Sequence, residues 1–132
     1  MAKLDDQARE FLDQKVIAHV ATLMPDGSPQ VSPVWIDHED DLVVFNTAEG
    51  RYKTENLEKD GRVAISMVDP ENPYTHVLVR GKVTELDREH ADDHINAMAK
   101  KYLGEDEYPF RQPGEVRVKV LIEPERVTIN AS

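Results

Sequence analysis

A short segment after an apolar run carries residue types that could bind an anion. The run ends at Phe45, Gly50 turns the chain, and the cations Arg51 and Lys53 follow two residues apart. If a helix begins near Arg51, its free backbone N–H groups, the Thr47 hydroxyl and both cations can converge on one phosphate. The alternative is a solvated turn with two surface cations, because no standard phosphate-loop pattern is present. The spacing alone leaves both interpretations open.

The overall charge makes this pair of cations unusual. The 132 residues include 26 acidic and 16 basic side chains, which gives a net charge of −10. Such a charge argues against nucleic acid, anionic membranes and polyphosphates as general partners. Any bound anion must therefore be met by a local pocket.

Composition also excludes several other kinds of chemistry. No cysteine is present, which excludes disulfides, thiolate catalysis and cysteine-ligated metals. The longest apolar runs are too short to span a bilayer, and the N-terminal segment lacks the apolar core of a signal peptide. We therefore expect a soluble cytoplasmic protein. No linker, repeat or low-complexity block divides the chain, which predicts one domain over residues 1–132.

Two histidines have the spacing of a metal site but not its other residues. His90 and His94 stand four apart on a predicted helix, where two imidazoles can share a metal, with Asp93 adjacent. A zincin helix carries a glutamate after the first histidine, whereas Ala91 stands here. We expect no metal at this position. A hydrolase has no support either, because no serine lies in a nucleophile-elbow pattern.

The elements that would position the candidate residues alternate as in a small barrel with helices packed on it. Apolar spacing predicts an amphipathic helix over residues 5–14, a short helix that ends at Asp60–Gly61, and a longer helix that Asp87 caps and Gly104 ends. Runs rich in β-branched and aromatic residues predict strands at residues 16–23, 30–36, 42–47, 62–68, 74–85, 116–122 and 126–130.

These elements predict a mainly β fold with flanking helices. About six to seven strands and two longer helices favour a closed or partly closed antiparallel β-barrel, since closure removes exposed edges. Gly81 is expected at a bulge, where the barrel wall bends. A barrel this small has limited room inside. A cofactor-sized ligand is therefore expected against the outer wall, in a groove shared with a second subunit.

Five segments carry a family resemblance through their order and spacing. They are Pro25–Trp35, Asn46-Thr47 with Gly50-Arg51-x-Lys53-x-x-Asn56-Leu57, Arg62–Ser66, Pro73-Tyr74 with Val79-Arg80-Gly81, and Tyr102–Glu115. Together they resemble the pyridoxamine 5'-phosphate oxidase-like superfamily, whose fold is the FMN-binding split β-barrel. Within it the match is best to the F420-dependent oxidoreductase group, which uses the deazaflavin coenzyme F420.

The resemblance implies a homodimer with a cofactor groove at the subunit interface. Its cofactor phosphate would be held by Arg51 and Lys53. Further residues assigned to the cofactor on the same basis are Asn46, Thr47 and Asn56 near the phosphate and Ser32, Pro33, Val34 and Trp35 along the ring system. Arg111 or Lys119 could meet the carboxylates of the cofactor tail.

One departure from the family argues against vitamin oxidation. True pyridoxamine phosphate oxidases end in a basic, tryptophan-containing segment, whereas this sequence ends in Glu123–Asn130 without one. The resemblance therefore implies hydride transfer from reduced F420 to an unsaturated or oxidised small molecule whose identity the residues do not reveal. The protein would supply binding, orientation and water exclusion. The alternative is an FMN- or haem-binding split-barrel protein, a flavin oxidoreductase or a non-catalytic module, since the same Arg-x-Lys pair would accept the FMN phosphate.

The sequence contains no obvious catalytic constellation. Tyr74 and His76 fall on one face of the predicted strand 74–85 and are the candidates for a substrate-side proton donor. The alternative is that both are structural or solvated. The catalytic residues therefore remain unassigned at this level.

Overall fold

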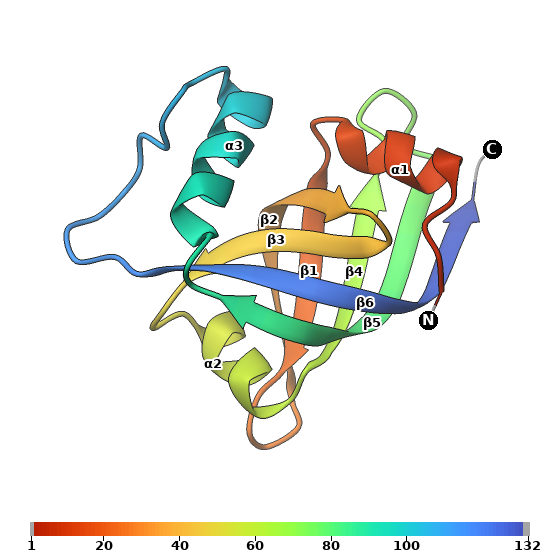
Figure 1. Cartoon of the computed structure of the whole chain (residues 1–132). Helices are drawn as coiled ribbons and strands as arrows, with labels where there is room; N and C mark the ends of the chain where they lie inside the picture. Colours follow the sequence, from red (N-terminus) through yellow and green to blue (C-terminus); the bar gives the residue numbers. More distant parts are fainter. Residues whose placement is uncertain (1, 131–132) are drawn as a thin grey trace.

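The six strands of the barrel close on themselves in the computed structural model, which describes residues 2–130 (Figure 1). The strands are β1 (Ile17–Leu23), β2 (Pro29–Glu39), β3 (Leu42–Ala48), β4 (Arg62–Val68), β5 (His76–Asp87) and β6 (Arg117–Asn130). Around the barrel they follow the order β1-β2-β3-β6-β5-β4, with every neighbouring pair antiparallel. The predicted mainly β barrel is confirmed, with six strands.

Alternating burial along the strands fills the barrel with apolar side chains. In β1 and β4 every second residue is buried, as expected for strands with one face toward a core. Ile36 of β2 lies directly opposite Phe45 of β3, and both are fully buried in this core. A barrel filled in this way has no room for a cofactor, so a ligand must bind outside it.

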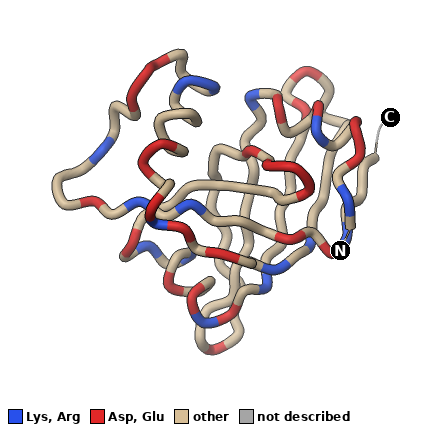
Figure 2. The backbone as a smooth tube through the Cα atoms, viewed as in Figure 1, with Lys and Arg blue, Asp and Glu red and all other residues tan. Residues whose placement is uncertain are grey.

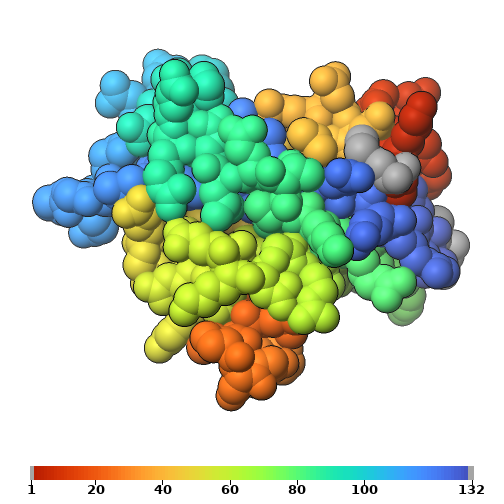
Figure 3. All heavy atoms as spheres, turned by 60° about the horizontal axis from the view of Figure 1, so that its bottom comes forward, coloured from red at the N-terminus to blue at the C-terminus, as the bar shows by residue number. Residues whose placement is uncertain are grey.

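Within residues 2–130 three helices cover the barrel, and α1 and α2 lie on opposite sides of it (Figure 1). In α1 (Asp6–Asp13), Phe11 and Leu12 are buried, and the Asp5 side chain caps the helix by accepting the Ala8 N–H. The eight-residue α2 (Tyr52–Lys59) packs on β1 and β2, beside the β1–β2 hairpin, which is orange in Figure 3. Among the described helices only α3 (Ala91–Leu103) exceeds eight residues. The prediction of two longer helices is therefore confirmed for α3 and wrong for α1.

The helix α3 packs on the outer wall, over β2, β3 and β6. It ends where Gly104 adopts a left-handed conformation with φ 74°, as the sequence predicted. No helix among residues 2–130 combines the length and the apolar character that a membrane crossing requires. Acidic residues are spread over helices, turns and strands rather than gathered at one place (Figure 2).

The predicted strands 116–122 and 126–130 are one strand, β6, which runs through Pro124. Pro124 stands opposite Gly81 of β5, where the register between the two strands shifts. A proline is tolerated at such an irregularity because a ladder hydrogen bond is already missing there. A Cβ on Gly81 would overlap the Glu123 carbonyl oxygen, so only glycine fits. The predicted bulge at Gly81 is thereby confirmed.

The start of β5 differs from the prediction. The strand begins at His76, and Tyr74 lies in the preceding turn, where its backbone N–H donates to the Asn72 side chain. The backbone N–H of Thr75 donates to the Asn72 carbonyl and completes this turn. The expectation that Tyr74 and His76 share one strand face is therefore wrong, because local turn hydrogen bonds hold Tyr74 outside the sheet.

Candidate anion and cofactor pocket

A pocket of about 300 Å³ opens on the outer wall of the barrel, beside α3. This volume is at the small end of ligand-binding pockets. Four polar residues gather in it and the rest of its lining is apolar or aromatic. The lining residues are Ile17, Pro33, Val34, Trp35, Asn46, Arg51, Lys53, Ile95, Met98, Tyr108, Phe110 and Arg117.

Segments remote in sequence meet at this pocket. The turn that leads into α2 is tied to the segment before β6 by a hydrogen bond from the Glu49 N–H to the Val116 carbonyl, 2.9 Å. In Figure 3 this turn (yellow) lies against the loop that follows α3 (blue). The cations Arg51 and Lys53 therefore come next to Arg117, the first residue of β6.

Lys53 is a buried cation without an acidic partner. Its side chain lies in the first turn of α2, the residue is 8 % exposed, and it makes no hydrogen bond or ion pair within residues 2–130. Burial lowers the pKa of its ammonium, and the positive charges of Arg51 and Arg117 lower it further. Three cations thus share one small volume, an arrangement that costs free energy unless an anion joins them.

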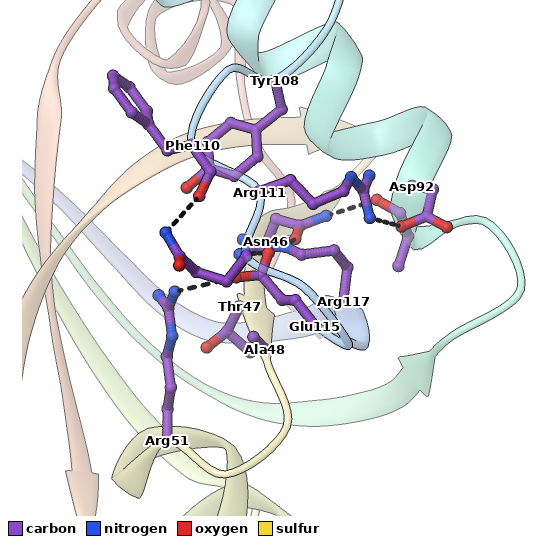
Figure 4. A network of polar contacts seen from close by, with 12 residues as sticks. Asn46, Thr47, Ala48, Arg51, Asp92, Tyr108, Phe110, Arg111, Glu115 and Arg117 are labelled. Carbon is purple, nitrogen blue, oxygen red and sulfur yellow. Dashed lines mark hydrogen bonds and ion pairs between the residues drawn. The ribbon is translucent and has the colours of Figure 1, made fainter.

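Arg117 is held rigidly at the pocket wall (Figure 4). The residue is 4 % exposed, its Nε donates to the Asn46 side-chain oxygen at 2.8 Å, and its Nη1 donates to Glu115 at 2.9 Å. Its guanidinium also lies 5.1 Å from the centre of the Tyr108 ring, a cation–π contact. Such a guanidinium is already oriented before any ligand arrives.

The charges around the pocket leave an excess of positive charge. Glu115 pairs with Arg117 and lies 4.0 Å from the Arg51 guanidinium. Among residues 2–130, no other carboxylate forms an ion pair with these cations. One carboxylate therefore faces three cations, in a protein whose net charge is −10. These four groups would be balanced by an anion of about two negative charges.

Aromatic rings form the adjoining wall. Trp35 stacks on Tyr102 with a centroid distance of 5.1 Å and an interplanar angle of 7°. Tyr108 meets Trp35 edge-on at 6.0 Å, and Phe110 meets Tyr108 edge-on at 5.7 Å. Such offset and edge contacts fix the ring orientations. A flat, largely apolar ligand group would find complementary surface here.

The end of α3 is fastened to β2 behind this wall. The Tyr102 hydroxyl donates to the Val16 carbonyl at 2.6 Å and accepts the Ile36 N–H at 3.0 Å. Lys101 donates to the Ile36 carbonyl at 2.8 Å. Burial raises the pKa of Tyr102 and lowers the pKa of Lys101. These contacts stabilise the position of Tyr102, on which Trp35 stacks.

Comparison with known proteins identifies the family. A family model described as pyridoxamine 5'-phosphate oxidase matches residues 4–130. The chain belongs to the pyridoxamine 5'-phosphate oxidase family. The closed antiparallel barrel is the fold expected of this family's split-barrel superfamily, so the resemblance noted from the sequence motifs is confirmed.

Solved structures agree with the family assignment. An F420 reductase is 27 % identical, with a TM-score of 0.80 over 91 % of this chain and 94 % of that chain. The protein Rv2991 from Mycobacterium tuberculosis is 22 % identical, with a TM-score of 0.76 over 98 % of this chain and 84 % of that one. HupZ from Group A Streptococcus is 24 % identical, with a TM-score of 0.67 over 97 % and 99 %. The last two share the fold.

Six of the nine residues predicted to contact a cofactor line the pocket of this family member. They are Pro33, Val34, Trp35, Asn46, Arg51 and Lys53. The other three lie outside the lining. The Thr47 hydroxyl is 3.0 Å from the Thr54 hydroxyl, and Asn56 donates to the Thr22 hydroxyl at 2.9 Å, so both tie α2 to the barrel. The Ser32 hydroxyl is buried and has no hydrogen-bond partner among the residues that the structure describes.

The residues suggested for the cofactor tail and for proton donation also lie outside the pocket lining. Arg111 pairs with Asp92 at 3.0 Å and Lys119 pairs with Glu39. The His76 Nε2 is 3.0 Å from the Asn130 side-chain nitrogen. Tyr74 is exposed in its turn. Within one protomer, these side chains are engaged elsewhere or face solvent.

Sequence analysis missed Arg117, the most buried of the three pocket cations. It lies at an alternating position of a predicted strand, where a basic residue is usually solvated. Tyr108 and Phe110 belong to the segment Tyr102–Glu115 that carries the family resemblance, but the sequence predicted no contact with a ligand for them. The signal that could have found Arg117 is Asn46, since a polar residue inside an apolar strand needs a buried partner.

The histidine pair does not form a metal site. His90 is exposed and pairs with Asp87, whereas His94 is buried and faces Asn46. Among residues 2–130 no cluster of three or more His, Asp or Glu side chains could hold a metal ion. His94 is buried because the packing of α3 on β3 covers it, whereas the spacing alone did not distinguish the two histidines.

Proposed function

We propose that this family member is an F420-dependent oxidoreductase that transfers a hydride from reduced coenzyme F420 to an unsaturated or oxidised small molecule. The observation that carries this proposal is the buried, unpaired Lys53 between Arg51 and Arg117, at the foot of an aromatic wall. Similarity to an F420 reductase over 91 % of the chain supports the deazaflavin as the cofactor.

The pocket residues fit the parts of such a cofactor. Lys53 and Arg117 would hold its phosphate from the buried side, and the half-exposed Arg51 would close the site toward solvent. Trp35 and Pro33 would flank the ring system. When bound, the reduced cofactor supplies the hydride, so these residues need only bind it, orient it and exclude water.

The origin of the proton is a separate question. The described lining of the pocket contains no carboxylic acid or histidine. The proton is therefore expected from solvent or from a second copy of the chain across the groove. Tyr74 and His76 remain candidates in that second role, because both lie near the surface of their own protomer.

We also propose that the protein is a homodimer. Four large apolar side chains are exposed on the neighbouring strands β2, β1, β4 and β5, namely Val31, Ile17, Val68 and Leu78. A hollow of about 470 Å³ lies over this face and is lined by Val31 and Leu78. Ile17 also lines the cofactor pocket, so a second copy on this face would border the pocket.

The alternative cofactor is FMN, because the same cations would accept its phosphate. A titration followed by tryptophan emission separates the two, since Trp35 is the single tryptophan and lines the pocket. We expect saturable quenching by F420 and weaker binding of FMN, because the anionic F420 tail can meet further basic residues. Salt must be matched, since exposed contacts are screened. Tighter binding of FMN than of F420, or quenching by haem alone, would overturn the proposal.

A further inference from the structure

The side-chain amide of Asn46 is fixed in one orientation by two neighbours. Its Oδ1 lies 2.8 Å from Arg117 Nε, and a guanidinium nitrogen can only donate a hydrogen bond. Its Nδ2 lies 2.9 Å from the Ala91 carbonyl oxygen, which can only accept one. Both neighbours independently require the oxygen toward Arg117 and the nitrogen toward α3. The amide therefore cannot flip without losing both hydrogen bonds.

This orientation determines the proton position on His94. The second hydrogen of Asn46 Nδ2 points to His94 Nδ1, 3.0 Å away. Nδ1 must therefore accept, which places the proton of the neutral imidazole on Nε2. His94 is 7 % exposed. Its Nε2 has no hydrogen-bond partner within residues 2–130, and an Asp37 carboxylate oxygen lies 3.7 Å away.

A second proton on His94 conflicts with this arrangement. It would occupy Nδ1, where the imidazole N–H would face the amide N–H of Asn46. If the amide rotated to present its oxygen to His94, its nitrogen would face Arg117 Nε, and two donors would oppose each other. Without rotation, the two opposed N–H groups repel each other and strain the amide whose oxygen accepts from Arg117. With rotation, the buried Arg117 Nε loses its acceptor.

We propose that His94 is a positioning residue for the anion pocket: neutral His94 holds Asn46, Asn46 holds Arg117, and protonation of His94 loosens Arg117 and weakens anion binding. The proposal rests on the proposed function only in taking Arg117 as a contact of the cofactor's anionic group. It assigns a role to a histidine that touches neither the pocket nor its ligand.

Charged groups on three elements face this histidine. Asp37 lies on β2, and Arg117 lies on β6, on the far side of Asn46. On α3 itself, His90 precedes His94 by one turn and Lys101 follows it by two turns. Burial acts to raise the pKa of Asp37, but His94, the His38 backbone N–H and Lys101 together lower it.

The first test measures the tautomer by NMR of the imidazole nitrogens in the protein without ligand. We expect the neutral ring of His94 to carry its proton on Nε2, with Nδ1 as an acceptor. A neutral ring protonated on Nδ1 would overturn the proposal. This readout involves no cofactor, so it is independent of the proposed function.

The second test measures sulfate affinity as a function of pH, because sulfate keeps its charge where phosphate titrates. Acidification makes the whole protein less negative, which by itself strengthens anion binding. We expect the opposite in the wild type: affinity falls by about tenfold as His94 gains its second proton, with the midpoint that NMR reports for this ring.

Two variants and one control complete this test. His94→Asn keeps an acceptor near the Nδ1 position but does not titrate, so its sulfate affinity should no longer fall at low pH. His94→Phe removes the acceptor and should bind sulfate weakly at every pH. His90→Asn removes an exposed histidine of the same helix and should retain the wild-type profile. If His94→Asn keeps the wild-type profile, or if wild-type affinity rises on acidification, the proposal is wrong.

Failure of the proposed function gives a different pattern. If sulfate binding follows His94 but F420 does not bind, the positioning role stands and the cofactor assignment fails. If F420 binds but sulfate affinity does not change when His94 is protonated, the cofactor assignment stands and the positioning role fails. If His94→Phe does not fold, His94→Asn and the tautomer measurement still separate failure of the positioning role from failure of the cofactor assignment.

Discussion

Lys53 lies in surroundings that oppose its own charge. Burial and two neighbouring arginines lower the pKa of its ammonium, and no carboxylate within residues 2–130 forms an ion pair with it. A residue selected only for stability would be neutral at this position, because a buried charge without a partner costs free energy. A bound anion would remove this cost. At the scale of single residues, the proposed function therefore predicts that Lys53 lowers the stability of the protein and raises its affinity for the cofactor.

Lys53→Met should change cofactor affinity and stability in opposite directions. We expect F420 affinity to fall by about 1.5–3 kcal/mol, the usual contribution of a hydrogen bond to a charged group, while the free energy of unfolding stays equal or rises. Isothermal calorimetry and urea unfolding measure the two quantities. Lys59→Met is the matched control, because Lys59 is an exposed cation of the same helix. Unchanged affinity in Lys53→Met would contradict the site assignment.

The same residue predicts a pH dependence of stability. The folded state lowers the pKa of Lys53, so between that value and the unfolded value the unfolded chain binds more protons. Stability contributed at this position therefore rises with pH. The advantage of Lys53→Met over the wild type in unfolding free energy should shrink as the pH approaches about 10, the ordinary range of lysine. A constant difference across this range would contradict the prediction.

At the scale of elements, the barrel depends on one close approach between β5 and β6. The two strands shift register at Gly81, where Pro124 stands opposite and the Glu123 carbonyl occupies the space of a side chain. The bend allows β6 to continue as one strand from the pocket residue Arg117 to Asn130. The bulge therefore connects barrel closure with the position of Arg117 in the pocket wall.

Gly81→Ala should destabilise the protein by about 2–4 kcal/mol, because its Cβ would overlap backbone that cannot move without disrupting the ladder. Gly61→Ala is the control, since its Cβ would meet Val83 at 3.5 Å or more, an ordinary contact. Urea unfolding of both variants measures the difference. Equal stability of the two variants would show that the β5–β6 approach is looser than described.

At the scale of the whole molecule, the apolar face on β2, β1, β4 and β5 is the surface that a second copy would cover. Val31 is 62 % exposed and Leu78 is 41 % exposed, so neither contributes much to the core of one protomer. Covering them removes apolar area from water and would close the cofactor groove from outside. Dimerisation and cofactor binding are therefore expected to be coupled.

If the protein is the proposed dimer, Leu78→Glu should convert it to a monomer without unfolding the barrel, because the charge falls on an exposed position. Light scattering measures the mass, and the Trp35 titration reports whether F420 still binds. Leu103→Glu is the control, since Leu103 is equally exposed but lies at the end of α3. A wild-type monomer that binds F420 would contradict the shared groove.

Local sequence patterns determined most of the elements and half of the pocket. The strand Arg62–Val68 has the predicted bounds, Gly104 ends α3, and Gly81 lies at a bulge, because period, glycine and turn chemistry act within a few residues. The pair Arg51 and Lys53 was visible for the same reason, since a turn and a helix start bring both side chains to one place.

Only the tertiary structure decided which side chains share the pocket. Arg117 joins Asn46 from 71 residues away because β6 pairs with β3 in a register that sets Arg117 opposite Ala48. A shift of one residue would turn Arg117 to the other face of the sheet. The same alternation sends Thr47 to α2 although it adjoins Asn46 in the chain. Register and barrel closure are properties of paired strands, so no single segment of the sequence contains them.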